Sequence, residues 1–250
     1  METPIDQLRV RRAYLSPTDP SNRWSHVGRQ TTSHSPLPLT LPHRGRLKVL
    51  CVGAHPDDIE IGCGATVLDL VRQGADVRWA VFSGNERRAE EAARSARLFL
   101  GSDAARHLVL HQFRDAHFPT HFTAIKDAFE ALASRFAPDL VFTHYRDDRH
   151  QDHRVLSDVA WNTFRRQTIA EYEIPKWDGD LSTPNLYVPV AAPAARRKVS
   201  ILMSVFASQR RRDWFGEGVF FGLMRLRGME CRSRSGFAEA FFGRKLVFRP

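Results

Sequence analysis

The stretch LKVLCVGAHPDDIE, residues 47–60, joins an apolar run to a turn that holds one imidazole and two carboxylates. Its first six residues are apolar except for one lysine, which is typical of a buried strand. Pro56 fixes its own φ and favours an extended conformation in the residue before it, so the turn is stiff. We therefore expect His55, Asp57 and Asp58 to leave a strand end in defined directions. Converging nitrogen and oxygen donors of this kind are typical of a catalytic metal site.

Strand and helix patterns alternate four times after this start. Strands are expected at residues 47–52, 77–82, 107–110 and 139–143, and helices at residues 61–73, 86–100, 123–136 and 153–166. This alternation predicts an α/β protein, a Rossmann-like three-layer sandwich with a mostly parallel central sheet. Ligands of such folds bind beyond the carboxyl ends of the strands, and we expect the active site there.

A dinucleotide site is the alternative for a first strand that runs into a turn and a helix. The turn at residues 53–58 lacks GxGxxG, and it places carboxylates where a pyrophosphate requires backbone N–H groups. These residues argue against a nicotinamide cofactor in this turn.

A second cluster, HYRDDRHQDH at residues 144–153, follows the fourth expected strand. Its last histidine, His153, forms a facial set with His55 and Asp58. Two neutral imidazoles and one carboxylate leave net positive charge on a zinc ion, which lowers the pKa of a bound water to about 7. Asp57 is then a candidate base for that water. Taken singly, these residues are more often surface groups or helix caps, and it is the joint pattern that favours a site.

The chain has 250 residues, 42% of them hydrophobic, and a formal charge of +9. We expect an extended or flexible arm at residues 1–45, because this part is rich in proline, and a single catalytic domain at residues 46–250. Three cysteines without CxxC spacing favour a reduced, cytoplasmic setting. No apolar stretch approaches the roughly 20 residues of a transmembrane helix. The apolar C-terminal segments fit a core, a substrate groove or a homo-oligomer interface.

The motifs AHPDD at residues 54–58 and HQDH at residues 150–153 resemble the PIG-L/LmbE-like family of zinc-dependent de-N-acetylases. The resemblance extends over residues 47–250. It implies a Rossmann-like domain that binds one zinc ion per chain and hydrolyses an acetamide on an amino sugar. Such enzymes act in the synthesis of glycosylphosphatidylinositol, mycothiol, bacillithiol and glycopeptide antibiotics.

The resemblance also implies roles for individual residues. It places zinc on His55, Asp58 and His153, and it makes Asp57 the general base. The two other members of the implied catalytic set are His150 and Asp152.

In the family pattern His150 polarises the amide carbonyl or protonates the leaving amine, and Asp152 holds an imidazole in position. Some members carry a tyrosine two residues before this histidine as an oxyanion donor, and this chain has Asp148 there.

Three further residues lie at expected strand ends where a sugar can be bound: Arg88, Asp115 and Glu173. Solvated helix and turn positions are the alternatives for them. The remaining nearby histidines are expected to be surface, cap or supporting groups: His111, His117, His121 and His144.

The leading hypothesis is a metal-dependent N-deacetylase, an amide hydrolase acting on linear amides, that removes acetyl from an N-acetylated amino sugar or a related small amide. Its substrate is expected to be a sugar-type small molecule, free or linked to phosphate or a nucleotide. A same-fold alternative is an amidase of a thiol conjugate. The alternative from another class, a basic nucleic-acid-binding protein, follows from the arginine excess, but the chain has no reading motif and we expect no nucleic acid.

Overall fold

The structure, a computed structural model, describes residues 45–244. The expected N-terminal arm at residues 1–45 therefore lies outside the described residues except for its last position. A single sheet of seven strands runs through the described part, in the order β3-β2-β1-β4-β5-β7-β6. The strands are β1 (Lys48–Gly53), β2 (Asp76–Ser83), β3 (Leu108–Phe113), β4 (Leu140–His144), β5 (Thr168–Tyr172), β6 (Leu186–Pro189) and β7 (Ala238–Gly243).

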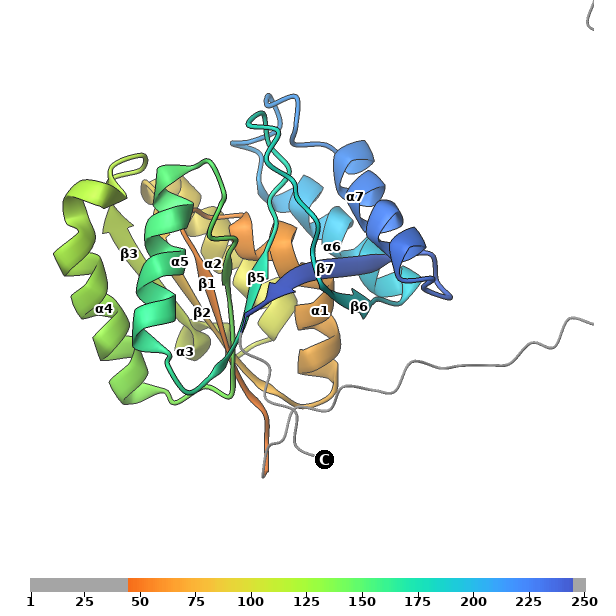
Figure 1. Ribbon diagram of the computed structural model, residues 1–250. Coiled ribbons are helices and arrows are strands. Elements are labelled where there is room, and N and C mark those ends of the chain that lie inside the picture. The colour runs from red at the N-terminus through yellow and green to blue at the C-terminus, as the bar shows by residue number, and fades with distance from the viewer. Residues whose placement is uncertain (1–44, 245–250) are drawn as a thin grey trace, which may run out of the picture. The chain divides into compact units, whose positions relative to one another are not determined.

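Helices cover both faces of this sheet (Figure 1). On one face α4 and α5 pack together, and on the other face α1 packs with α2 and α6, while α7 packs on β7 and α6. The helices are α1 (Asp58–Arg72), α2 (Glu86–Leu100), α3 (Ala104–His107), α4 (Phe122–Arg135), α5 (Gln151–Thr163), α6 (Ala192–Val205) and α7 (Glu217–Glu230), with a 3-10 turn η1 (Phe118–His121). The predicted three-layer α/β sandwich is confirmed.

The strand order places a topological switch beside β1. This strand pairs in parallel with β2 on one side and with β4 on the other, so the chain leaves β1 and β4 in divergent directions. A crevice forms between the loops that follow two such strands. Both polar motifs lie where these two loops enter the next helix, since residues 54–58 run from the β1 loop into α1 and residues 150–153 run from the β4 loop into α5.

The four strands and four helices expected from the sequence are present as β1–β4, α1, α2, α4 and α5, with several ends displaced. The first helix begins at Asp58 instead of residue 61, because the AHPDD turn already takes part in it. A one-turn helix, α3, precedes β3 and moves that strand to Leu108–Phe113. The sequence patterns did not predict β6 and β7, which pair antiparallel with each other, while β7 also pairs antiparallel with β5.

The core on the α4 and α5 side explains why the sequences of the central strands are continuous apolar runs. It contains Val52, Phe82 and Val141 from three neighbouring strands, packed on Phe129 and Leu156 from the helices. All five are buried, as expected for parallel strands covered on both faces. No helix within residues 45–244 is long and apolar enough to cross a membrane.

Candidate functional site

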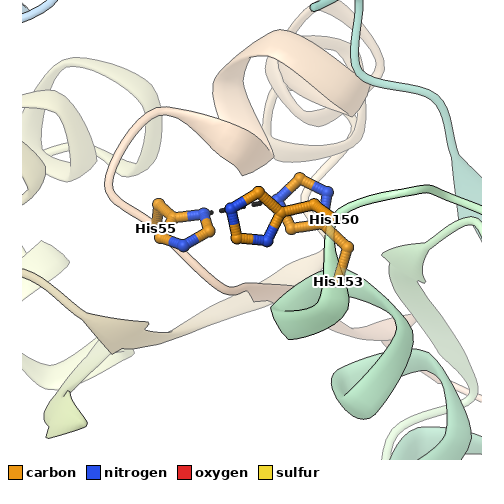
Figure 2. Close-up of side chains that lie close together, drawn as sticks. All are labelled: His55, His150 and His153. Atoms are coloured by element: carbon orange, nitrogen blue, oxygen red, sulfur yellow. Dashed lines mark hydrogen bonds between the residues drawn. The ribbon is translucent and has the colours of Figure 1, made fainter. Parts of the chain in front are cut away.

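Three imidazoles converge where the β1 and β4 loops meet (Figure 2). His55 stands on the loop after β1, His150 caps the N-terminus of α5, and His153 lies in the first turn of α5. The ring centroid of His55 is 4.8 Å from that of His150 and 5.2 Å from that of His153. Residues almost 100 positions apart are thus brought into one cluster by the pairing of β1 with β4.

The three expected metal ligands present their donor atoms to one another. Nδ1 of His55 lies 3.3 Å from Oδ2 of Asp58 and 3.3 Å from Nε2 of His153. Nε2 of His153 lies 3.5 Å from the same Asp58 oxygen. Ligands at 2.0–2.2 Å in a tetrahedral zinc site stand about 3.4 Å apart, so these separations fit such an ion.

Carboxylates hold the far nitrogen of each imidazole. Nδ1 of His153 lies 2.9 Å from Oδ2 of Asp148, and Nε2 of His55 lies 3.0 Å from Asp115 and 3.4 Å from Asp152. An N–H directed at each carboxylate leaves the opposite nitrogen of the ring with a free lone pair that faces Asp58. This is the usual arrangement around ligating histidines.

The carboxylates around His55 and His153 form a group of hydrogen-bond acceptors that attracts positive charge. Burial lowers the pKa of His55, but the carboxylates of Asp58, Asp115 and Asp152 outweigh burial and hold that pKa well above its ordinary value. Burial acts to raise the pKa of Asp58, but the neighbouring histidines, His153 first, hold it well below its ordinary value. The donor set therefore fits a divalent cation on electrostatic as well as geometric grounds.

Other combinations of nearby residues also bring metal-binding atoms together. They are His55 with His150 and His153, His55 with Asp115, His150 and Asp152, and Asp58 with His144 and His153. In the last set, Nε2 of His144 already accepts the backbone N–H of Ala54 at 2.9 Å. That hydrogen bond occupies the lone pair that a metal would require, which argues against His144 as a ligand, although the same nitrogen lies 3.3 Å from the Asp58 carboxylate.

Asp57 occupies an unusual backbone position beside this cluster. Its φ of 108° lies in the left-handed region, which side chains other than glycine seldom adopt and which is concentrated at functional sites. Arg88 donates from Nη2 to Oδ1 of Asp57 at 3.0 Å. Oδ2 is buried and has no hydrogen-bond partner among the described residues. Burial raises the pKa of Asp57 to about 8, while Arg88 opposes the shift.

His150 and Asp152 have different surroundings. Burial lowers the pKa of His150, and its Nδ1 accepts the backbone N–H of Asp152 at 3.3 Å. Asp152 is fully buried and accepts the backbone N–H groups of Ala116 and Phe118 at 2.7 and 3.0 Å. Asp152 therefore fastens the loop after β3 to α5 and supports His55 more directly than it supports His150.

The site lies in a cavity whose wall contains most of the expected residues. It is lined by His55, Asp57, Asp58, Arg88, Asp115, His150 and His153, together with Ile174, Lys176, Trp177, Asp178, Gln209, Arg212 and Trp214. Asp152 lies behind this wall. The sequence suggests the segment from Trp177 onward, with Asp178, Trp214 and its arginines, as a surface that could meet a substrate, but no motif points to Ile174, Lys176 or Gln209.

Glu173 does not line the cavity, contrary to the expectation that it contacts substrate. Both of its carboxylate oxygens accept hydrogen bonds from Arg227 at 2.7 Å, and the pair is buried. A neutralised pair of this kind serves packing between β5 and α7. The structure thus corrects the expected position of Glu173, which faces α7 instead of the site.

His144 and Asp148 both take supporting positions around the cluster, and a supporting role is one of those expected for His144. His144 is fully buried and takes part in the cluster through Asp58. Asp148 binds His153 and Nζ of Lys176, the latter at 2.9 Å, and it does not line the cavity. Asp148 thus orients His153 and does not face the cavity in which an oxyanion would develop.

Known proteins resemble the chain in sequence and in fold. Residues 50–164 match the family PIG-L, GlcNAc-PI de-N-acetylase, and both polar motifs lie within this range. The uncharacterized deacetylase YaiS of Escherichia coli (strain K12) is 31% identical over 144 residues, which cover 52% of this chain and 75% of that protein.

Solved structures share the fold at lower identity. The conserved protein TT1542 from Thermus thermophilus is 22% identical with a TM-score of 0.65, covering 82% of this chain and 97% of that one. N,N'-diacetylchitobiose deacetylase from Pyrococcus horikoshii is also 22% identical with a TM-score of 0.59, covering 79% and 83%.

A different reaction is found on the same fold. GalB, the 4-carboxy-2-hydroxymuconate hydratase from a Pseudomonas putida strain, is 15% identical with a TM-score of 0.64, covering 82% of this chain and 98% of that one. The fold by itself therefore does not decide the reaction. Sequence identity to YaiS, which extends over three quarters of that protein, does decide the family: this chain belongs to the PIG-L family of deacetylases.

Proposed function

We propose that this protein is a zinc-dependent hydrolase that removes the acetyl group from an N-acetylated amino sugar. The observation that carries the proposal is the set of three donor atoms, on His55, Asp58 and His153, that lie 3.3–3.5 Å from one another. Beside them, Asp57 presents a buried oxygen without a partner among the described residues. A cation site with an adjacent base is the minimum that amide hydrolysis by an activated water requires.

Zinc suits the donor set better than magnesium or calcium. Two imidazole nitrogens and one carboxylate oxygen are borderline ligands, whereas magnesium and calcium prefer oxygen alone. A bound zinc ion would supply a water of low pKa and would polarise the amide carbonyl. Three protein ligands leave a fourth position for that water, as in catalytic zinc sites.

Two residues of the chain, Asp57 and His150, then carry out the proton transfers. Asp57 takes the proton of the attacking water through Oδ2, because Oδ1 is held by Arg88. A pKa of about 8 makes Asp57 a competent base only when positive charge nearby favours its ionised form, which a dication supplies. His150 lines the same cavity and donates a proton to the leaving amine.

A protein purified with its metal tests this proposal. We expect about one zinc per chain by elemental analysis, and release of a free amine from N-acetylated amino sugars that stops with a chelator and returns with zinc. Asp57→Asn is expected to keep the metal and to lose at least about 100-fold in kcat, since a positioned base contributes 10²–10⁴-fold.

Asp127→Asn, at an exposed position of α4, is the matched control and should retain wild-type turnover. Full turnover by zinc-loaded Asp57→Asn would remove Asp57 from the base role. Zinc binding without amine release from any acetylated sugar would instead contradict the deacetylase proposal, and release only from acylated thiol conjugates would favour the amidase alternative. The cytoplasmic setting and a homo-oligomer remain predictions.

A further inference from the structure

A second cavity, called here the α4 cavity, lies between α4 and the sheet, and α4 and β3 stand at the same edge of the molecule (Figure 1). Its volume is about 260 Å³, and it shares no lining residue with the cavity that holds the proposed metal ligands. Leu50 and Arg78 line it, and these two residues pair with each other in the first halves of β1 and β2. The α4 cavity therefore begins at the opposite end of these strands from the proposed metal ligands.

Short side chains on α4 leave this space open. Ala128 and Ala131 line the α4 cavity from the helix, where longer side chains would fill it. Its floor is apolar and comes from Leu50 and Phe136, which are 2% and 6% exposed. Each methylene group that leaves water for such a floor improves Kd about fourfold. The interior of the cavity thus favours a hydrocarbon group.

The mouth of the α4 cavity carries positive charge. Arg106 of α3 and Arg135, in the last turn of α4, are exposed and line the cavity. No carboxylate among residues 45–244 forms an ion pair with either guanidinium. No Asp or Glu of that part of the chain lines the cavity. Two uncompensated arginines at the mouth of an apolar cavity favour an anion there.

Arg78 supplies a further donor inside the cavity. Its guanidinium lies over the Phe136 ring at 4.2 Å, and Nη2 is 3.6 Å from a carboxylate oxygen of Asp76, so the side chain is held in place. Nε of Arg78 is nevertheless buried and has no hydrogen-bond partner among the described residues. Buried donors are normally paired with an acceptor, which can come from water or from a ligand.

The volume of the α4 cavity limits the size of a ligand. At about 30 Å³ for each water-sized group, it holds about nine such groups. A single hydrocarbon body of about eight carbon atoms fits this space when its polar head stays at the mouth. A lipid with two long chains is too large.

We propose that the α4 cavity binds a small amphipathic anion. Its apolar body of about eight carbon atoms lies on Leu50 and Phe136, and its carboxylate or phosphate head contacts Arg106 and Arg135. Binding here involves no covalent step. The inference goes beyond the proposed deacetylase function and does not depend on it.

Four probes separate the contributions of the apolar body and of the charge: octanoate, octyl phosphate, 1-octanol and acetate. Calorimetry on the complete, zinc-loaded chain measures their Kd values. We expect octanoate to bind about tenfold more tightly than 1-octanol, with a difference that shrinks at high salt, because contacts with two arginines are electrostatic. Acetate, which lacks the apolar body, should bind at least about 100-fold more weakly than octanoate.

The comparison of the two charged heads identifies the class of anion. Tighter binding of octyl phosphate would support a phosphate ligand, and tighter binding of octanoate would support a carboxylate. Either result agrees with the inference, whereas binding of neither probe contradicts it.

Substitutions assign the binding to the α4 cavity. Ala128→Leu fills the cavity and should raise the Kd of octanoate at least about tenfold. Ala124→Leu, at an exposed position one turn earlier on α4 and outside the cavity wall, is the matched control and should bind octanoate like wild type.

The charge is tested at an exposed residue, where a substitution does not disturb the core. Arg135→Gln should raise the Kd of octanoate about threefold and leave that of 1-octanol unchanged. Arg97→Gln, at an exposed position of α2 outside the cavity wall, is the control.

Two outcomes of these experiments would overturn the inference. Equal Kd values for octanoate and 1-octanol would remove the anion from the α4 cavity. Equal octanoate binding by Ala128→Leu and Ala124→Leu would place octanoate elsewhere on the protein, for example at the bound zinc. Amine release by wild-type protein, measured separately, bears on the proposed function alone.

Discussion

Glu60 lies two residues from Asp58 and shows how strongly surroundings decide the chemistry of a carboxyl group. It is 2% exposed, and burial raises its pKa to about 7, although the neighbouring Ser95 opposes the shift. Asp58, in the same helical turn, shifts in the opposite direction because histidines surround it. Glu60 does not line the cavity, so its raised pKa follows from burial and not from a catalytic role.

Replacement of this group by its neutral isostere should therefore stabilise the protein at high pH. Glu60 binds its proton more tightly folded, with a pKa of about 7, than unfolded, where the value is near 4.5. Its contribution to stability is complete below about pH 4.5 and is lost as pH rises through 7. We expect Glu60→Gln to exceed wild type by up to about 3 kcal/mol in unfolding free energy at pH 8, with little difference at pH 4.5.

Denaturant unfolding of metal-free protein at several pH values measures this difference. Glu90→Gln, at an exposed position of α2, serves as the control and should track wild type at every pH. If the difference in unfolding free energy between Glu60→Gln and wild type did not change with pH, the pKa of Glu60 would not be raised in the folded protein.

At the scale of elements, helix α1 carries a kink that a buried ion pair occupies. The backbone of Cys63 leaves helical geometry at φ −140° and ψ 15°. Glu239 of β7 accepts the N–H groups of Ala65 and Thr66 at 2.9 and 2.7 Å, and Lys198 of α6 donates to the carbonyl of Ile61 at 2.6 Å. The pair thus satisfies the backbone groups that the kink leaves unpaired.

The kink matters because the turn before it bears Asp58. Lys198 and Glu239 contact each other at 2.6 Å and are about as buried as the core, at 3% each. Gly62 adjoins the kink and packs on the Tyr172 ring, where an added Cβ would lie 2.2 Å from a ring carbon. Close packing and the ion pair together set the position of the turn that bears Asp58.

Removal of one partner from this pair should be strongly destabilising. Lys198→Met leaves the Glu239 charge buried, and we expect a loss of about 3 kcal/mol in unfolding free energy, measured by denaturant titration. Lys198→Met combined with Glu239→Gln should recover part of the loss, because no uncompensated charge remains. Arg197→Met, at the exposed neighbouring position, is the control. If Lys198→Met alone had the unfolding free energy of this control, Glu239 would take up a proton in the folded variant at little cost in free energy.

At the scale of the whole molecule, the expected metal ligands join parts of the chain that are almost 100 residues apart. His55 and Asp58 belong to the β1–α1 connection, and His153 belongs to α5. An ion that binds only this folded arrangement stabilises it by mass action. Metal binding should therefore be visible in stability as well as in activity.

Chelation should lower the thermal midpoint of the wild type. At free zinc 100-fold above its Kd the linkage amounts to about 2.7 kcal/mol, which corresponds to roughly 5–10 °C for a domain of this size. His153→Asn should show no response to chelator, whereas His111→Asn, outside the cluster, should respond like wild type. An unchanged wild-type midpoint on chelation, measured by calorimetry, would contradict a metal site that bridges β1 and α5.

The sequence alone determined the features that are written locally along the chain. Alternating apolar periods predicted the α/β sandwich, because a strand or helix buries its own face whatever its neighbours are. The motifs that begin at residue 54 and residue 150 also placed His55, Asp58 and His153 at the carboxyl ends of two strands, where the structure brings their side chains together. Their roles as ligands stay predictions that the metal experiments test.

Only the tertiary structure decided which distant segments meet. The pairing of β1 with β4 buried His144 under Asp58, and the packing of α7 on the sheet took Glu173 away from the cavity to Arg227. Trp177 and Trp214 are 37 positions apart on segments without a motif, yet they form one wall. Local patterns report what each residue prefers, whereas these contacts depend on the free energy of the entire fold, which no single segment contains.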